Sequence, residues 1–314
     1  MGPGAGESDD GDAGAESVAA GSVPEDDAWA ALRAAGRRWG VDVEGARLVR
    51  SGTNVVFRLP GRRVARVASR GAEVVARRSV AVARWLESVG FPAVRVVAGV
   101  DQPVAVGGCM VTLWRLVSQE ERWAGVGQIG EVVRRLHWLE EPASLGLPLL
   151  EPLRETVRRL GSLRGLSDAD REFLGARAEA LGRRFGELEF VLPRGMVHGD
   201  ASVGNVLLDD DGNPVVMDLD GFAVGPREWD LVLTALYFER FGWHTRSEYE
   251  AFVRGYGFDV MNWYGYPVLA DMRELMMTVW LARKVPGDSE AAEEVQRRIH
   301  DLRTDGDRHG WRPF

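Results

Sequence analysis

The chain has 314 residues, a formal net charge of −8 and a single cysteine, Cys109. This length allows one large or two modest domains, and one cysteine excludes an internal disulfide, which favours a reducing cytoplasm as the compartment. Arginines interleaved with acidic residues argue against a nucleic-acid partner, and the lack of an apolar run of about 18 residues argues against a membrane span.

The N-terminal third predicts an acidic tail followed by a small, sheet-rich unit. Residues 1–27 are small, polar and acidic without periodicity, so we expect them to be disordered. Helices are predicted at residues 28–39 and 72–89 from their apolar spacing. Short strands are predicted at residues 48–50, 55–59, 64–67, 94–97 and 110–114.

The segment between residues 196 and 231 is the most informative part of the chain. His198, Gly199 and Asp200 open it, and Asn205 follows at the spacing of the kinase catalytic loop, H-x-D-x-x-x-x-N. At this position Asp200 is expected to accept the proton of an attacking hydroxyl, a contribution of about 10²- to 10⁴-fold. His198, flanked by apolar residues, is expected to brace the backbone through hydrogen bonds rather than to carry protons.

A β-hairpin is predicted directly after this loop, because two apolar runs flank the turn formers at residues 209–214. If Leu208 pairs with Val215, the antiparallel register places Asn205 opposite Asp218, with Cβ atoms about 5 Å apart. Magnesium prefers one or two protein oxygens completed by substrate phosphates, so Asn205 and Asp218 are predicted to bind it. Asp220, two residues further in an extended segment, is predicted to hold a second metal, a metal-bound water or arginine side chains.

The other acidic residues around the hairpin, and one histidine earlier in the chain, are predicted to have structural roles. The acidic run at residues 209–211 is interpreted as a solvated turn. Asp230 either caps a helix that begins at Leu231 or reaches back to hold the catalytic loop, and the second interpretation is preferred. His137 is interpreted as a structural residue of a helix, because no partner motif accompanies it.

The C-terminal third predicts helices at residues 231–241, 247–256, 269–284 and 289–303. Its aromatic residues are individually interpreted as core, although they are dense enough to bind a ring. Basic and acidic residues alternate in the last two helices, so we expect no strongly anionic face there.

Together these motifs resemble the aminoglycoside phosphotransferase family of the protein-kinase-like superfamily. The resemblance rests on residues that fall in the order of the family: His198-Gly199-Asp200, Asn205, Asp218-Leu219-Asp220, Gly225-Pro226 and Trp229-Asp230-Leu231. It implies an α+β, two-lobed kinase-like fold with a nucleotide-binding N-lobe at residues 28–113, a hinge at 114–118 and a C-lobe with the catalytic and acceptor sites at 119–314.

The resemblance also implies nucleotide contacts in the N-lobe and hinge. The turn of Ser51, Gly52, Thr53 and Asn54 takes the place of the glycine-rich loop over the phosphates. Arg66 stands where the family carries a lysine for the phosphates, and it keeps a positive charge with a different geometry.

Two further positions follow from the same resemblance. Ser79 replaces the helix glutamate that would pair with the phosphate-binding cation, and Glu73 is a substitute candidate. In the hinge, Arg115 and Val117 are expected to meet the adenine edge with backbone groups.

The expected function is transfer of the γ-phosphate of ATP, with Mg²⁺, to a hydroxyl of an antibiotic-like acceptor in resistance or self-protection. A nucleoside-type or macrolide-like compound fits the mixed charge of the last helices better than a polycationic aminoglycoside. GTP is an alternative donor, a primary metabolite such as an amino alcohol or sugar is an alternative acceptor, and a nucleotide-binding pseudokinase regulator is the alternative without catalysis. The protein is expected to be cytoplasmic and monomeric, with no nucleic-acid or membrane partner.

Overall fold

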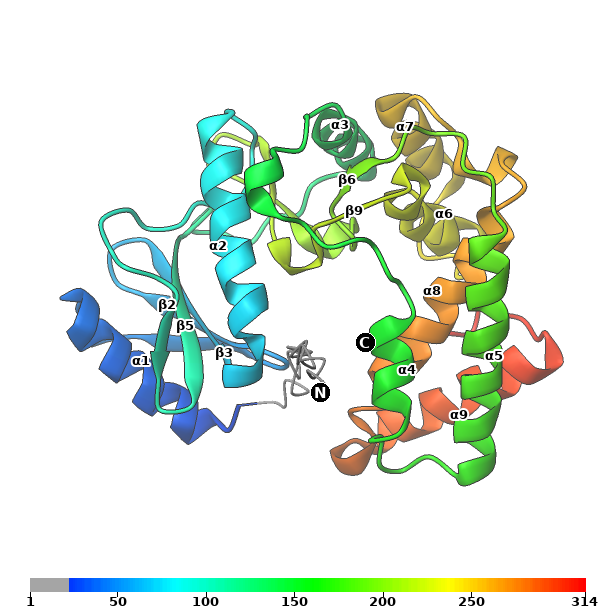
Figure 1. Ribbon diagram of the computed structural model, residues 1–314, viewed down its shortest axis with the longest axis horizontal. Helices are drawn as coiled ribbons and strands as arrows, with labels where there is room; N and C mark the ends of the chain where they lie inside the picture. Colours follow the sequence, from blue (N-terminus) through cyan, green and yellow to red (C-terminus); the bar gives the residue numbers. More distant parts are fainter. Residues whose placement is uncertain (1–22) are drawn as a thin grey trace, which may run out of the picture.

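A five-stranded antiparallel sheet forms the first lobe of the computed structural model, which describes residues 23–314 (Figure 1). The strands lie in the order β1-β2-β3-β5-β4. Their bounds are β1 Arg47–Ser51, β2 Val55–Leu59, β3 Arg63–Ser69, β4 Val104–Val106 and β5 Cys109–Arg115.

The two faces of this sheet are covered by different helices. Val55, Phe57 and Leu59 alternate along β2 and are buried against α1 (Glu25–Trp39), as the period of a strand requires. Helix α2 (Glu73–Ser88) packs on the other face, where Arg66 lines a small cavity together with Val75 and Ser79 of α2.

Helix α1 begins three residues before the predicted start. Acidic residues occupy its first turn, where their negative charge interacts favourably with the helix dipole. Most of the predicted tail, residues 1–22, lies outside the described residues.

One predicted strand of this lobe is wrong. Residues 94–97 form only an isolated bridge, Val96 to Trp114, while the fifth strand is β4, which the sequence analysis did not place. Residues 92–94 instead pair with the hairpin of residues 206–216, called the catalytic hairpin below. The Val216 N–H donates to the Pro92 carbonyl and the Val94 N–H donates to the Val216 carbonyl, both at 2.9 Å. The chain at this point therefore joins the sheet lobe to the hairpin.

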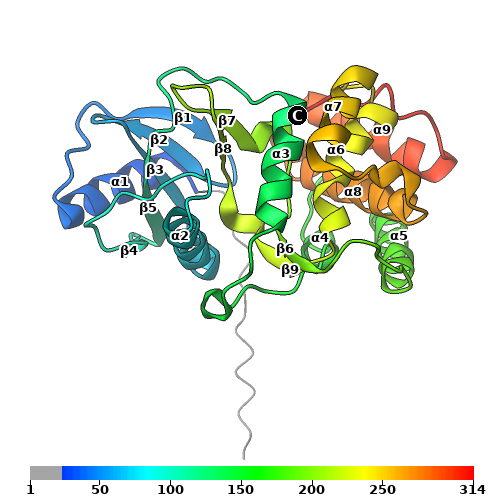
Figure 2. The ribbon, with the colours of Figure 1, turned by 90° about the horizontal axis from the view of Figure 1, so that it is seen from above.

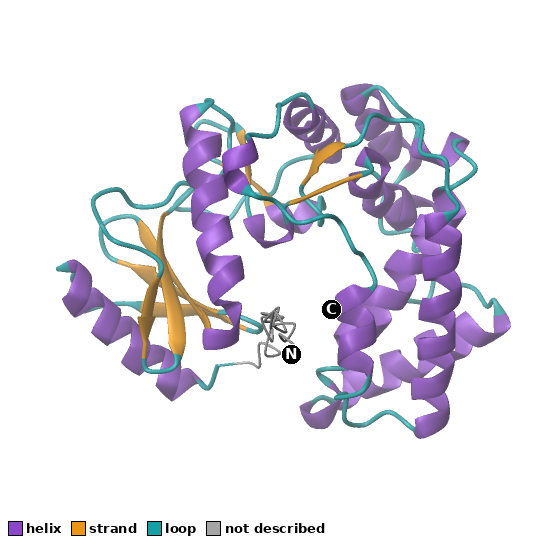
Figure 3. Cartoon of the chain, in the orientation of Figure 1, coloured by secondary structure: helices purple, strands orange, loops and turns teal. Residues whose placement is uncertain are grey.

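The second lobe is helical (Figure 3). Its helices are α3 Val126–His137, α4 Arg154–Leu160, α5 Asp168–Gly186, α6 Val232–Glu239, α7 Arg246–Tyr256, α8 Tyr266–Leu281 and α9 Ser289–Thr304. Helix α8 lies at the centre, packed against α4, α5, α6 and α9. The predicted α+β class, with a sheet-rich first part and a helical second part, is confirmed. Among the helices of residues 23–314, none is both long and apolar enough to cross a bilayer.

Short elements connect these helices. Single-turn 3₁₀ helices lie at η1 Arg70–Ala72, η2 Ala143–Leu145, η3 Val203–Asn205, η4 Leu219–Gly221, η5 Arg227–Asp230, η6 Val260–Asn262 and η7 Val285–Gly287. Two pairs of short strands, β6 (Gly195–Val197) with β9 (Ala223–Gly225) and β7 (Val206–Leu208) with β8 (Pro214–Val216), hold the catalytic segment between the lobes (Figure 2).

The predicted hairpin is present, but its predicted register is wrong by one residue. Leu208 pairs with Pro214 rather than Val215, so Asn205 faces Met217, whose N–H donates to the Asn205 carbonyl at 2.8 Å. The reason is the turn: the Asp209 N–H donates to the Asn213 carbonyl, and Gly212 takes a positive φ of 85°. The tighter loop shifts the ladder and leaves Asp218 beyond its end.

Candidate active site

The catalytic loop depends on two glycines whose backbones pack directly against each other. Gly199 has a φ of 86°, and a Cβ at this position would lie 2.4 Å from the Gly221 carbonyl oxygen. A Cβ on Gly221 would lie 2.7 Å from the His198 carbonyl oxygen. Neither contact can be tolerated, so glycine at both positions lets η4 approach the loop that carries Asp200.

The buried side chain of Asp230 binds the backbone of this loop. Its carboxylate has no exposed surface and accepts hydrogen bonds from the His198 N–H at 2.6 Å and the Gly199 N–H at 2.9 Å. His137 Nε2 lies 3.0 Å from the same carboxylate, and Tyr256 Oη lies 2.8 Å from His137 Nδ1. Burial opposes the charge, but the hydrogen bond from His137 holds the pKa of Asp230 below its usual range. The preferred interpretation of Asp230 as a brace is confirmed, and His137 has the structural role expected of it.

His198 links the loop to the hairpin. The Asp200 N–H donates to Nδ1 at 3.2 Å, which leaves Nε2 to carry the proton and donate to the Met217 carbonyl at 2.7 Å. The ring therefore braces the backbone on both sides, as predicted, and fixes the spacing between the loop and the start of the Asp218 segment.

Asp200 and Asn205 are in direct contact. Asn205 Nδ2 donates to Asp200 Oδ2 at 2.9 Å and to the Asp200 carbonyl at 2.8 Å. The Asn205 carboxamide oxygen has no partner within the described residues, so it is available to a metal. The Asp200 side chain is 57% exposed, and its carboxylate can therefore receive a hydroxyl from a bound molecule.

Asp218 carries negative charge that the protein compensates only in part. Its backbone is left-handed, with φ 49° and ψ 67°, a conformation that aspartate tolerates better than most residues. The nearest cation is Arg66, whose Nη1 lies 3.7 Å from Oδ1. Partial burial and the neighbouring Asp220 raise the pKa of Asp218, against the opposing effect of Arg66. A half-exposed carboxylate in this state fits a divalent cation.

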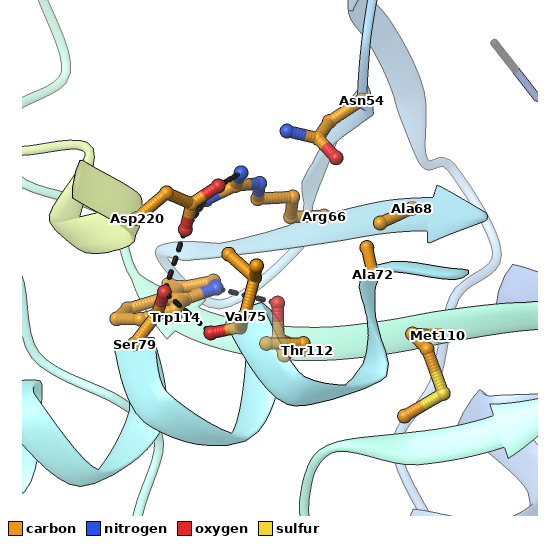
Figure 4. Close-up of a pocket in the computed structure, with 11 residues that line it drawn as sticks. Asn54, Arg66, Ala68, Ala72, Val75, Ser79, Met110, Thr112, Trp114 and Asp220 are labelled. Carbon is orange, nitrogen blue, oxygen red and sulfur yellow. Dashed lines mark hydrogen bonds and ion pairs between the residues drawn. The ribbon is translucent and has the colours of Figure 1, made fainter. Parts of the chain in front are cut away.

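Arg66 is held by Asp220, as Figure 4 shows. Nη1 donates to Oδ1 at 3.0 Å and Nη2 donates to Oδ2, a bidentate pair. Burial alone would lower the pKa of Arg66, but Asp220 and Asp218 raise it. Ser79 Oγ also donates to Asp220 Oδ1 at 2.6 Å, and Arg78 Nη2 donates to its carbonyl at 2.9 Å. Of the roles expected for Asp220, the structure therefore shows contact with arginine.

The helix glutamate candidate is wrong. Glu73 pairs with Arg77 one turn along α2, at 2.8 Å, and does not reach Arg66. Ser79 contacts the ion pair of Arg66 and Asp220 by donating a hydrogen bond to Asp220, and it does not contact Arg66 directly. The adjoining cavity has a volume of about 20 Å³, enough for one water molecule.

The turn at residues 51–54 faces Arg66 on one side and the second lobe on the other. With its carboxamide oxygen placed toward the guanidinium, Asn54 accepts from Arg66 Nε at 2.9 Å. Thr53 Oγ1 accepts from Arg283 Nη1 at 3.3 Å. Ser51 and Gly52 are exposed. The structure thus brings Asn54 and Arg66 together and places Thr53 at the point where the lobes meet.

The hinge offers fewer backbone donors than predicted. The Arg115 N–H donates to the Arg95 carbonyl and the Leu116 N–H to the Arg62 carbonyl, both at 2.8 Å. The Arg115 N–H is therefore not free for an adenine edge. Val117 has no backbone hydrogen bond in the part of the chain that the structure describes, so its N–H is the available donor.

Asp210 has a larger role than the solvated turn predicted for it. Ser118 Oγ donates to its Oδ1 at 2.7 Å, and Arg62 Nη2 donates to its Oδ2 at 2.5 Å. Arg62 belongs to the β2–β3 turn and Ser118 to the hinge. The tip of the catalytic hairpin thus joins both lobes, whereas its neighbour Asp209 closes the turn as predicted.

Sequence reasoning missed two residues beside Asp200. Arg273 of α8 places Nη1 3.6 Å from Asp200 Oδ1 and donates from Nη2 to the Gly199 carbonyl at 2.9 Å. Tyr237 of α6 lies nearby, and burial together with the Asp200 charge raises its pKa to about 12. Both lie on helices far along the chain, and no local motif marks either residue.

The sequence of the chain matches a known protein family. Residues 45–274 match the model of the phosphotransferase enzyme family. No curated protein matches the chain in sequence at a significant level.

Among solved structures, an amicoumacin kinase in complex with AMP-PNP and Ca²⁺ superposes with a TM-score of 0.72 at 13% identity, over 90% of this chain and 95% of that one. An aminoglycoside phosphotransferase from Streptomyces rimosus gives 0.57 at 22% identity, over 81% and 99%. A choline kinase from Streptococcus pneumoniae gives 0.55 at 15% identity, over 82% and 93%.

The kinase-like fold predicted from the catalytic hairpin is confirmed by these similarities. The prediction of an ATP-dependent phosphotransferase agrees with the matched family, which spans the sheet lobe, the hinge and the catalytic segment. The chain therefore belongs to the phosphotransferase enzyme family.

Proposed function

We propose that the protein transfers the γ-phosphate of ATP to a hydroxyl of a small, antibiotic-like acceptor. The observation that carries this proposal is the juxtaposition of three groups: an exposed Asp200 carboxylate, an Asn205 carboxamide with its oxygen free, and a partly compensated Asp218. A binding protein has no use for an accepting carboxylate in this position, whereas a phosphotransferase requires one.

Each residue has a defined task in the transfer. Asp200 accepts the hydrogen bond of the acceptor hydroxyl and aims its oxygen at the γ-phosphorus. Arg66 and the turn at residues 51–54 contact the phosphates. Asn205 and Asp218 are the proposed ligands of Mg²⁺, which when bound neutralises phosphate charge. Asp220 contributes by holding Arg66, because its two oxygens are already occupied by Arg66 and Ser79.

The hinge supports a nucleotide but does not select its base. Val117 offers one backbone N–H to the purine edge, a contact that adenine and guanine can both use. We propose ATP as the donor, with GTP as the alternative that a nucleotide competition assay separates.

The face of α8 next to Asp200 favours an uncharged or anionic acceptor. Arg273 and Trp280 are seven residues apart, so they lie on one face about 10 Å from each other. Trp280 is 39% exposed, and Lys284 Nζ lies 4.8 Å from its ring. From residue 275 to 284 the helix and its end carry no acidic residue. This surface repels a polycation and offers an aromatic ring to a flat or apolar molecule.

The experiment that tests the function is a phosphorylation screen. The protein is incubated with Mg·ATP and a panel of macrolide, nucleoside-type and aminoglycoside antibiotics, amino alcohols and sugars. Products are detected by mass spectrometry as the gain of one phosphoryl group, with Asp200→Asn as the control. Transfer that collapses in the control supports the proposal and identifies the acceptor class. Nucleotide binding without any phosphorylated product would contradict it and favour a pseudokinase regulator.

A further inference from the structure

We propose that Arg273 is a positioning residue of the transfer reaction, which fixes the Asp200 carboxylate in the orientation that meets the acceptor hydroxyl. The inference rests on the proposed function. It concerns a side chain that belongs neither to the catalytic loop nor to the nucleotide site, because Arg273 comes from the middle of α8.

The guanidinium of Arg273 is enclosed and makes several contacts with the catalytic segment. The residue is 4% exposed. Nη2 donates to the Gly199 carbonyl at 2.9 Å and to the Trp229 carbonyl at 3.3 Å. Cζ lies 4.0 Å from the centre of the Trp229 ring, and the indole Nε1 donates to the same Gly199 carbonyl at 3.0 Å. The Trp229 ring and two backbone carbonyls therefore fix the position of the guanidinium independently of Asp200.

The buried positive charge of Arg273 is compensated by Asp200. A buried cation needs an anionic partner, and within the described residues Asp200 is the carboxylate in ion-pair distance of Arg273, with Nη1 to Oδ1 at 3.6 Å. Burial lowers the pKa of Arg273, while Asp200 and Asp230 oppose that effect. Nε has no hydrogen-bond partner in the same part of the chain. The contact with Asp200 is therefore more than incidental packing.

The two oxygens of Asp200 have different partners, an ion pair on one and a hydrogen bond on the other. Oδ1 faces Arg273 and Oδ2 accepts from Asn205 Nδ2 at 2.9 Å, so rotation of the carboxylate is restricted about its Cβ–Cγ bond. A planar guanidinium contacts the loop carbonyl and the carboxylate through a rigid fork of N–H groups, which fixes their relative orientation in a way that a rotatable ammonium does not. The pair therefore sets both the position and the orientation of the accepting oxygen.

This role suits the chemistry of phosphoryl transfer. As the bond from the acceptor oxygen to the γ-phosphorus forms, the bond to the bridging oxygen of ADP breaks and the hydroxyl proton passes to Asp200. The benefit of Arg273 lies in the orientation of the Asp200 carboxylate toward the acceptor hydroxyl. Arg273 keeps its own proton throughout.

The chain offers a matched control for losing such a residue. Arg298 of α9 is also buried, at 2% exposed, stacks on Trp311 at 4.8 Å and donates to a backbone carbonyl at 2.6 Å. Its carboxylate partner is Glu294, and among the described residues its link toward Asp200 is an electrostatic interaction with Tyr237. Arg298→Met therefore reports what the loss of a buried, stacked arginine costs when the contacts of Arg273 with the catalytic loop are left in place.

The test compares Arg273→Met, Arg273→Lys and Arg298→Met in steady-state kinetics with the acceptor found in the screen. We expect Arg273→Met to lower kcat by about 100-fold, the effect of misplacing a reacting group by about 1 Å, while KM for ATP stays within about threefold. Arg273→Lys should recover part of that loss, since it restores charge without the planar fork. Arg298→Met should keep kcat within about threefold, whatever its melting temperature.

A second measurement does not depend on transfer. Amide hydrogen exchange at residues 198–200 should be about 10-fold faster in Arg273→Met and unchanged in Arg298→Met, because the Gly199 carbonyl loses one of its two side-chain donors and keeps only the Trp229 indole. Wild-type kcat and wild-type exchange in Arg273→Met would overturn the inference. If the wild type transfers phosphate to no acceptor, the proposed function fails, and the exchange measurement alone decides whether Arg273 positions the loop.

Discussion

Replacing Asp230 with asparagine should destabilise the protein strongly, because its buried carboxylate accepts two backbone N–H groups and faces His137. A hydrogen bond to a charged group contributes about 1.5–3 kcal/mol, and a buried donor left without a partner costs about 1–3 kcal/mol. Asparagine keeps one oxygen acceptor but turns its NH₂ toward another donor. We therefore expect a loss of about 2–4 kcal/mol, a large part of the stability of an ordinary domain.

Equilibrium unfolding in urea at pH 7 measures this loss, with Asp211→Asn as the control in an exposed turn. The folded pKa of Asp230 lies below its unfolded value of about 3.9, so its contribution is complete above that pH and disappears as the pH falls through the folded pKa. The gap between wild type and Asp230→Asn should thus be constant from about pH 5 to 8 and narrow below about pH 4. A difference under about 0.5 kcal/mol at pH 7 would refute the reasoning.

Three further substitutions test the rest of the site. Asp218→Ala should abolish transfer and its saturation by Mg²⁺; wild-type turnover with unchanged Mg²⁺ dependence, measured by titration, would show that the metal assignment is wrong. Ser79→Ala removes a hydrogen bond to Asp220 and should raise KM for ATP by about 3- to 10-fold, with an unchanged KM as the contrary result. Asp210→Ala breaks half-exposed contacts, so its urea unfolding midpoint should stay close to that of the wild type, and a shift as large as that of Asp230→Asn would contradict this account of the contacts.

The sequence allowed the catalytic segment to be predicted because its determinants are local. The spacing from Asp200 to Asn205, the turn formers between two apolar runs and the brace at Asp230 all lie within one stretch of chain. Arg66 could be placed in the same way, because it lies in the third short strand of the predicted sheet, the strand that carries the phosphate-binding cation in the family. These features depend on period, turn chemistry and motif spacing rather than on distant packing.

Other features depend on contacts that no local pattern encodes. The observed hairpin register differs by one residue from the predicted one. The Asp209 N–H and the Asn213 carbonyl close a tighter turn than a pairing of Leu208 with Val215 would need. The partner of Arg66 proved to be Asp220, reached across the lobes. Arg273 could not be identified, because its contacts with the catalytic loop arise only when α8 packs beneath it.

The contacts of Asp210 and Thr53 affect how the two lobes can separate. They lie near opposite ends of β2, whose five residues span about 17 Å. If the lobes rotate about the contact between Arg62 and Asp210, a rotation of about 10° displaces Thr53 by about 3 Å, which is enough to break its hydrogen bond to Arg283. Such a rotation would also stretch the pair of Arg66 with Asp220, which joins the lobes near the Thr53 end of β2. Asn205 and Asp218 keep their separation, because both belong to one segment whose strands are joined by the Met217 N–H and the Asn205 carbonyl.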